Sequence, residues 1–254
     1  MAYAVTGLLF FVAPTWASER FPWSVTQFVA MTIGGWCLGN AMMSGLAVRW
    51  WRWAEVRAIL LYLWSFAALQ IGVVLWFLDK LVLDTVLTYP YLAALGIGLA
   101  GGVAGVIELA RRRPSTDAGG TQPGILRLAV IAFVVVVGFL TAIAIFRPGS
   151  GRTLNIFPQE LSPFTVRAFG AFYLALIVGA VPLLWTRTSA SVAGYAAAGE
   201  WLIVFILLPV IFFWGVFDLE NHATQLIYPG TYVAVGVLAA LVVWRARRAV
   251  RSVT

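Results

Sequence analysis

The sequence predicts an all-α polytopic transmembrane helical bundle of about eight spans. The 254-residue chain is 62% hydrophobic and only 11% charged, and its mean hydropathy is +0.93. A soluble domain carries about 25% charged residues, and a globule of this size cannot bury so much apolar surface. The chain also divides into long apolar runs separated by short polar segments, which is typical of a protein whose solvent is the bilayer.

Eight apolar segments, each bounded by charged residues, Pro or Gly, are the expected helices. They lie near residues 1–13, 24–47, 56–78, 89–110, 125–146, 164–186, 195–217 and 228–246. A span needs about 20 apolar residues at about 1.5 Å rise per residue, and every segment except the first is long enough. The first, with 13 residues, has only about two-thirds of that length, so we expect either a partial span or a true start upstream of Met1.

Local signals mark one helix start and two packing faces. Ser162 followed by Pro163 has the pattern of an N-cap with proline at the first helical position, and it predicts where the sixth segment begins. Small residues recur in the fourth and eighth segments at spacings that let helix backbones approach closely, so we expect both segments to form inter-helix seams. These residues are Gly98, Gly101, Gly102 and Gly105, and then Gly236 and Ala240.

The two halves of the chain resemble each other. The stretch "WFLDKLVLDTVLTYPY" (76–91) resembles "WGVFDLENHATQLIYPG" (214–230), and in both an Asp precedes a Tyr-Pro pair by ten residues. The sequence therefore predicts two parallel four-helix repeats, residues 1–113 and 125–254. A cytoplasmic linker rich in Pro, Gly and Ser, residues 114–124, joins them. Four spans per unit give both units the same orientation, with a pseudo-two-fold axis along the membrane normal.

The positive charges predict the orientation. Twelve of the 17 Lys and Arg residues fall on one side of the segments and five on the other, so the positive-inside rule places both termini in the cytoplasm. We expect a multi-pass protein of the inner cell membrane. The net charge of +7 reflects this topology and does not indicate nucleic acid as a partner. The expected partners are the lipid bilayer and either another membrane protein or a second copy of the chain.

The motif "RWWRW" combines three Trp with two Arg at the predicted inner surface, and it consists of Arg49, Trp50, Trp51, Arg52 and Trp53. These side chains could bind anionic lipid headgroups. An aromatic belt with positive-inside charges explains the same residues without a specific ligand, and we prefer this interpretation.

Three polar residues inside the segments are the candidate substrate-binding residues: Glu200, Gln70 and Asn40. An ionisable residue at mid-bilayer indicates an ion or proton pathway. Counting back from the end of the seventh segment places Glu200 near the headgroups, which favours an interfacial role. In a structural interpretation Gln70 could donate a hydrogen bond to the Phe205 carbonyl, which Pro209 frees from its helix. In a functional interpretation Gln70, Asn40 and the kink at Pro209 would line a cavity. Buried amides of this kind more often join helices than bind solutes.

The outer-face loop "DLENHATQLIYPG" (218–230) holds the only histidine, His222, close to Asp218 and Glu220. A zinc site needs three or four His, Cys, Asp or Glu ligands, and one His with a lone Cys elsewhere makes a metal site improbable. The equivalent loop of the first half keeps the Asp and the Tyr-Pro but has leucine in place of the Glu and His. We therefore interpret the loop as a polar turn and expect no metal and no cofactor.

Three functions remain open at this stage. The first is a non-catalytic integral membrane protein, an accessory or scaffold subunit of a membrane complex, since no catalytic motif is present. The second is a transporter or channel for a small or lipidic solute, with a pathway at the repeat interface. The third, an intramembrane enzyme that uses the outer-face carboxylates and histidine, is the least favoured of the three.

Overall fold

The computed structural model describes residues 1–50, 53–112, 124–146, 156–186 and 188–251. Within these ranges every regular element is helical, so the all-α prediction is confirmed. The α-helices are α1 (Ala2–Val12), α2 (Pro14–Glu19), α3 (Gln27–Trp50), α4 (Trp53–Trp76), α5 (Thr88–Arg112), α6 (Gly124–Phe146), α7 (Pro163–Ala180), α8 (Ser189–Phe212) and α9 (Ile227–Arg251). Short 3-10 helices are η1 (Leu78–Lys80), η2 (Val181–Leu184), η3 (Trp214–Val216) and η4 (Ala223–Leu226).

Each of the eight expected apolar segments overlaps one of the longer helices or α1. Among the described residues, six helices are long and apolar enough to cross a membrane, as a multi-pass membrane protein requires: α4, α5, α6, α7 with η2, α8, and η4 with α9. The helix α3 is equally long but more polar, because it contains Asn40 and four glycines. The helix α1 has only 11 residues. The linker predicted over 114–124 lies almost wholly outside the described residues.

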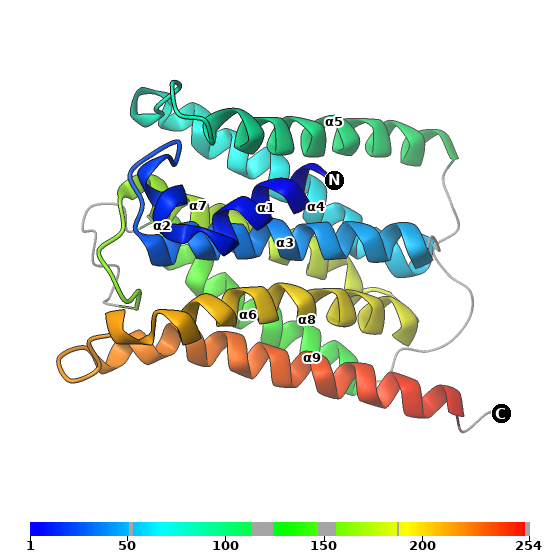
Figure 1. Ribbon diagram of the computed structural model, residues 1–254. Coiled ribbons are helices and arrows are strands. Elements are labelled where there is room, and N and C mark those ends of the chain that lie inside the picture. The colour runs from blue at the N-terminus through cyan, green and yellow to red at the C-terminus, as the bar shows by residue number, and fades with distance from the viewer. Residues whose placement is uncertain (51–52, 113–123, 147–155, 187, 252–254) are drawn as a thin grey trace.

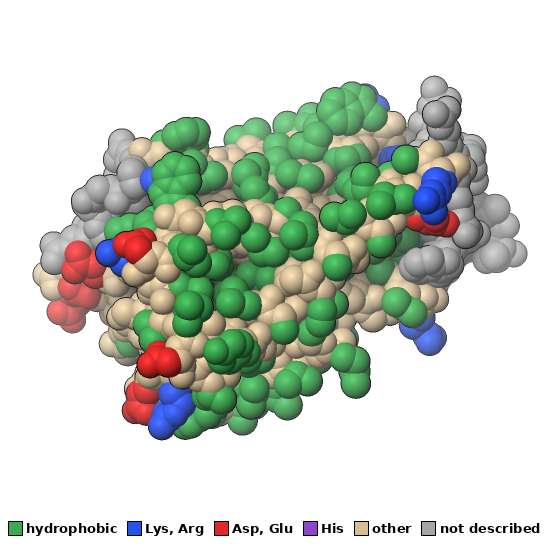
Figure 2. All heavy atoms as spheres, turned by 90° about the horizontal axis from the view of Figure 1, so that it is seen from above, with side chains coloured by type: hydrophobic (Ala, Val, Ile, Leu, Met, Phe, Trp, Pro, Cys, Tyr) green, Lys and Arg blue, Asp and Glu red, His purple; other side chains and the backbone are tan. Residues whose placement is uncertain are grey.

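The long helices run side by side with their axes roughly aligned (Figure 1). Helices α3, α4, α7 and α8 form the centre: α3 contacts α8, and α4 contacts both α7 and α8. The remaining helices flank this centre, with α1 on α3, α5 on α4, α6 on α7 and α9 on α8. Charged side chains gather at the two ends of the face seen in Figure 2, and apolar side chains cover its middle.

The start of α7 follows the prediction from sequence. Pro163 is its first residue, and the Ser162 hydroxyl accepts a hydrogen bond from the Thr165 backbone N–H at 3.2 Å. The same region joins the two halves of the chain, because the Trp23 indole N–H donates to the Thr165 hydroxyl at 3.1 Å. The Trp23 ring also stacks on Phe164, with the ring centroids 4.0 Å apart.

Glycines allow the central helices to approach closely. A Cβ at Gly35 of α3 would collide with the Phe205 carbonyl oxygen of α8, and one at Gly39 would collide with Leu202. On the other side of the core, a Cβ at Gly179 of α7 would lie 2.8 Å from the Ala58 carbonyl oxygen of α4. All three contacts join the N-terminal half of the chain to the C-terminal half. Close backbone approach of this kind stabilises membrane helices, which lack a hydrophobic drive to associate.

The predicted small-residue faces of α5 and α9 also pack against neighbouring helices. Gly102 and Gly105 face Trp64 of α4, and Gly236 of α9 faces Ile203 of α8. A Cβ at Gly101 would meet nothing within 4 Å, so this glycine lies outside the seam.

Candidate functional site

Asn40 lies in the interior of α3 and is fully buried. The Tyr62 hydroxyl of α4 donates a hydrogen bond of 2.7 Å to the Asn40 Oδ1. The Asn40 Nδ2 is also buried and has no hydrogen-bond partner among the described residues. The amide therefore joins two central helices through its oxygen.

Gln70 is buried in α4 and joins it to α7. Its Nε2 donates a hydrogen bond of 2.8 Å to the Ala168 carbonyl oxygen. The sequence-based expectation that Gln70 pairs with the Phe205 carbonyl is wrong, because Gly35 of α3 packs directly on that oxygen. Pro209 does lie inside α8, as the expectation required.

Replacing Gln70 by leucine should cost about 1 kcal/mol of folding stability, the typical worth of one hydrogen bond between membrane helices. Chemical or thermal unfolding of the purified protein in detergent micelles measures this loss. The matched control is Gln27→Leu, the same substitution at the exposed first residue of α3. Equal losses in the two variants would contradict a bond between α4 and α7.

Glu200 lies near the middle of α8, eleven residues after Ser189 and twelve before Phe212. At about 1.5 Å per residue it is roughly 16 Å along the axis from one end of the helix. The depth argument from sequence fails, because the helix begins six residues earlier than the segment 195–217 and ends five residues earlier. Glu200 is therefore not within a turn of either end of its helix.

The Glu200 side chain belongs to a strip of α8 that faces outward. Residues three or four apart share a helix face, and the strip continues through Val204, 45% exposed, to Ile211, 68% exposed; Trp201, 43% exposed, lies beside it. Glu200 is partly buried. Its Oε1 is buried and has no hydrogen-bond partner among the described residues.

The three candidate residues do not converge on one site. Asn40 bonds to Tyr62, which is eight residues, or roughly 12 Å along α4, from Gln70. A cavity of about 100 Å³ lies in the C-terminal half, between α6, α7, α8 and α9, and none of the three residues lines it. Its lining is almost wholly apolar.

The loop over 218–230 folds as a polar turn around Asp218. The Asp218 carboxylate accepts hydrogen bonds from the Asn221 side-chain amide at 2.9 and 3.1 Å, and the Asp218 backbone N–H donates to the buried Gln225 side chain at 2.8 Å. Glu220 is exposed and His222 is partly buried. Among the described residues, no group of three or more His, Cys, Asp or Glu side chains is placed to hold a metal ion.

The equivalent turn of the first half follows α4. Asp79 lies in η1 and forms an ion pair with Lys80 at 2.9 Å. A hydrogen bond from the Lys80 ammonium lowers the pKa of the Asp79 carboxyl. In both turns, therefore, the aspartate is engaged in local bonds.

Only part of the "RWWRW" motif, which was predicted to lie near lipid headgroups, falls within the residues that the structure describes. Arg49 is exposed near the end of α3, and Trp53 is partly buried at the start of α4. Trp51 and Arg52 lie outside the described residues, as does the side chain of Trp50.

Sequence reasoning missed the glycines that join the two halves and the cavity of the second half. Gly35 and Gly39 have the same small-xxx-small spacing that identified the face of α5, so this signal was available. The cavity is formed by side chains of several helices, and no local pattern predicts it.

No family model, curated protein or solved structure matches the chain.

Proposed function

We propose that the protein is a non-catalytic integral membrane protein that serves as an accessory or scaffold subunit of a membrane complex. The Glu200 carboxyl carries this proposal. A polar group without a partner in hydrocarbon costs several kcal/mol, and the Glu200 Oε1 has none among the described residues. The Asn40 Nδ2 and the Gln70 Oε1 are also buried without a partner among the described residues, but they lie in the packed centre of the bundle. Glu200 is only partly buried, so a partner helix that presents a hydrogen-bond donor at this depth would reach its carboxyl group. The exposed strip of α8 around Val204 is the surface that such a helix would cover.

The packing inside the helical bundle supports a structural role for the protein and argues against a pathway for a polar solute. Asn40 and Gln70, the other two candidates for such a pathway, are at most 1% exposed and are bonded to neighbouring helices. The cavity of the C-terminal half is apolar and reaches neither residue. These observations favour a packed bundle over a hydrated route between its halves.

The proposed topology has eight spans in two parallel four-helix repeats, with the repeats meeting at α3, α4, α7 and α8. The contacts between helices support this repeat. The pairs α1–α3 and α4–α5 of the first half correspond to α6–α7 and α8–α9 of the second, and the pair α3–α8 corresponds to α7–α4. In this topology α3 is a span whose polar residues face other helices, and α1 is a partial span.

The proposed orientation places the C-terminus on the cytoplasmic side of the inner membrane, with the N-terminus directed toward the same side but starting partway along the bundle (Figure 1). The ends of α5 and α9 lie at the same end of the bundle (Figure 1), and both carry arginines, Arg111 with Arg112 and Arg245. The turn between α4 and α5, which contains Asp79, and the turn between α8 and α9, which contains Asp218, lie at the opposite end of the bundle. The positive-inside rule supports this assignment.

A photo-crosslinking amino acid at Val204 of the full chain, irradiated in native membranes, tests the subunit role. We expect one protein adduct of discrete mass. Glu200→Leu should reduce its yield about tenfold, because an intramembrane hydrogen bond is worth on the order of 1–2 kcal/mol and 1.4 kcal/mol is tenfold in affinity. Glu200→Gln keeps an acceptor oxygen and should retain most of the yield.

The control places the same crosslinker at Val103 of α5, which is 54% exposed and has no carboxyl of this kind on its face. It should give no discrete protein adduct. A yield at Val204 that does not respond to Glu200→Leu would contradict the proposal. So would isolation of the chain from gentle detergent as a lone monomer.

A further inference from the structure

We propose that the cavity between α6, α7, α8 and α9 binds one acyl chain of a bilayer phospholipid. The inference is independent of the proposed subunit role. It follows from the polarity, depth and size of the cavity and from the side on which the cavity is open.

The cavity lining presents no unengaged hydroxyl group that would hold a water molecule. Four of its lining side chains carry hydroxyls, and each hydroxyl is engaged within the protein. Tyr232 donates to the Tyr173 hydroxyl at 3.1 Å, Tyr195 donates to the Leu176 carbonyl oxygen at 2.9 Å, and Thr231 donates to the carbonyl oxygen of the preceding helical turn at 2.7 Å. Buried water needs two to four polar partners, and apolar cavities without them stay dry and bind apolar guests. The occupant is therefore a hydrocarbon group.

The cavity lies at the depth of the acyl chains. Its lining on α9 extends from Thr231 to Val242, and its lining on α6 extends from Ala129 to Leu140. Each range covers eleven steps, or roughly 16 Å of helix axis. Both ranges lie well inside helices that are apolar enough to cross the membrane. The hydrocarbon of the surrounding bilayer is thus at the same level as the cavity.

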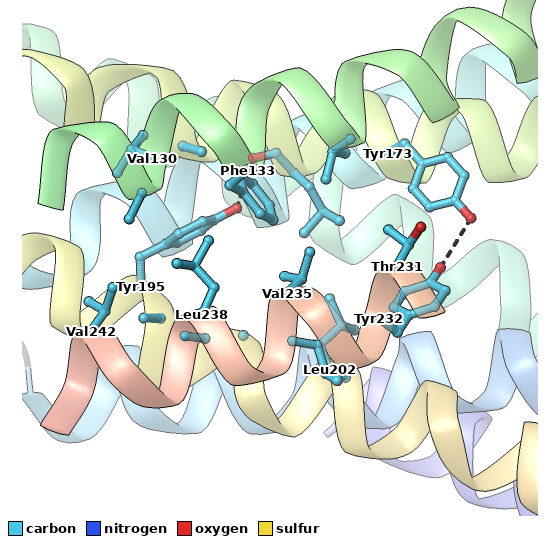
Figure 3. A pocket seen from close by; sticks show the side chains of 18 of the residues that line it. Val130, Phe133, Tyr173, Tyr195, Leu202, Thr231, Tyr232, Val235, Leu238 and Val242 are labelled. Carbon is cyan, nitrogen blue, oxygen red and sulfur yellow. Dashed lines mark hydrogen bonds between the residues drawn. The ribbon is translucent and has the colours of Figure 1, made fainter. Parts of the chain in front are cut away.

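The cavity is open on the side where α6 and α9 face each other. These two helices contact each other sparingly compared with the contact each makes to its other neighbour. The lining residues there, Phe133 on α6 and Val235 and Leu238 on α9, are only partly buried. Figure 3 shows Phe133 opposite Val235 and Leu238 across the gap. A chain entering from the bilayer passes between them.

The size of the cavity favours one linear chain. Its volume is about 100 Å³, below the roughly 150 Å³ of an engineered apolar cavity that admits benzene. A long and narrow space of this volume takes part of an acyl chain, while the headgroup of the same lipid remains at the membrane surface. Bulky ring systems do not fit it.

Gly199 of α8 provides a direct test. It lines the cavity, and a Cβ built on it would meet nothing within 4 Å, so a leucine at this position can begin its side chain without a clash and extend it into the space. The probe is phosphatidylethanolamine with a diazirine in its acyl chain, in liposomes of phosphatidylethanolamine and phosphatidylglycerol that contain the purified full chain. After irradiation, mass spectrometry should find label on the cavity-facing residues of α6 and α9. Gly199→Leu should reduce this label at least fivefold.

The matched control is Gly101→Leu, the same substitution at an exposed glycine of α5 whose Cβ also meets nothing. It should leave the cavity label unchanged. If Gly199→Leu does not give a monodisperse protein, Leu238→Trp narrows the opening instead and should reduce the label by a similar factor. Label that persists in a folded cavity-filled variant, or that polyprenol displaces and unlabelled phospholipid does not, would overturn the proposal. Because the purified chain is used alone, failure of the subunit proposal does not affect this result.

Discussion

Replacing Gly35 by leucine is expected to destabilise the folded protein by about 3 kcal/mol or more, at the upper end of the cost of overpacking a core. The added Cβ would collide with the Phe205 carbonyl oxygen. That oxygen belongs to the α8 backbone and cannot rotate away as a side chain would. The helices α3 and α8 must therefore separate, and with them the two halves of the chain. Loss of helical circular dichroism on heating in detergent measures the effect.

Gly101→Leu is the control for this variant, because it adds the same side chain to a transmembrane helix at a position with no neighbour within 4 Å. We expect its stability to equal or slightly exceed that of the unmodified chain, since leucine favours helix more than glycine does by somewhat under about 1 kcal/mol. Equal destabilisation by the two leucines would show that the close approach of α3 to α8 does not hold the halves together.

Replacing Trp36 by alanine is expected to cost about 3–5 kcal/mol, the usual range for removing a large buried aromatic side chain. Trp36 of α3 is 1% exposed and stacks on Phe172 of α7, with ring centroids 4.7 Å apart and an interplanar angle of 4°. Its ring also meets the edge of Phe169 at 4.7 Å. Removing the indole leaves a void between the two halves of the chain that the rigid backbones cannot close.

Trp76→Ala provides the comparison, because Trp76 ends α4 and is 80% exposed. This variant should change stability by less than about 1 kcal/mol. Unfolding of both variants in the same detergent, followed by circular dichroism so that the lost tryptophan does not affect the signal, gives the two values. A Trp36→Ala variant as stable as Trp76→Ala would contradict the packing of α3 on α7.

The helices of this fold could be predicted from sequence because apolar runs bounded by charge and proline are local signals. The ends of the helices also depend on packing against distant parts of the chain, as α8 shows. Its first turns, "SASVAG", are small and partly polar, so the segment was expected to begin at residue 195. Ser191 and Gly194 are buried against protein, where polarity is tolerated. The helix therefore begins at Ser189, and this difference moves Glu200 from an expected interface to the middle of its helix.

The neighbours of the polar residues could not be predicted in the same way. Gln70 could bond to any backbone carbonyl within reach, and its partner depends on which helix packs there. The Ala168 oxygen of α7 is close, whereas the Phe205 oxygen is covered by Gly35. Cavities are harder still, because the space depends on side-chain volumes contributed by several helices. The pattern of apolar residues along one helix does not reveal how much space the side chains of several helices leave between them.

The contacts that cross between the two halves have a consequence for biosynthesis. The N-terminal half is translated first, and at that moment Gln70 has no Ala168 and α3 has no α8 against which to pack. We therefore expect the early helices, and the more polar α3 above all, to be held less stably in the membrane until the later helices emerge. A chain that terminates after α5 should then be degraded in the cell.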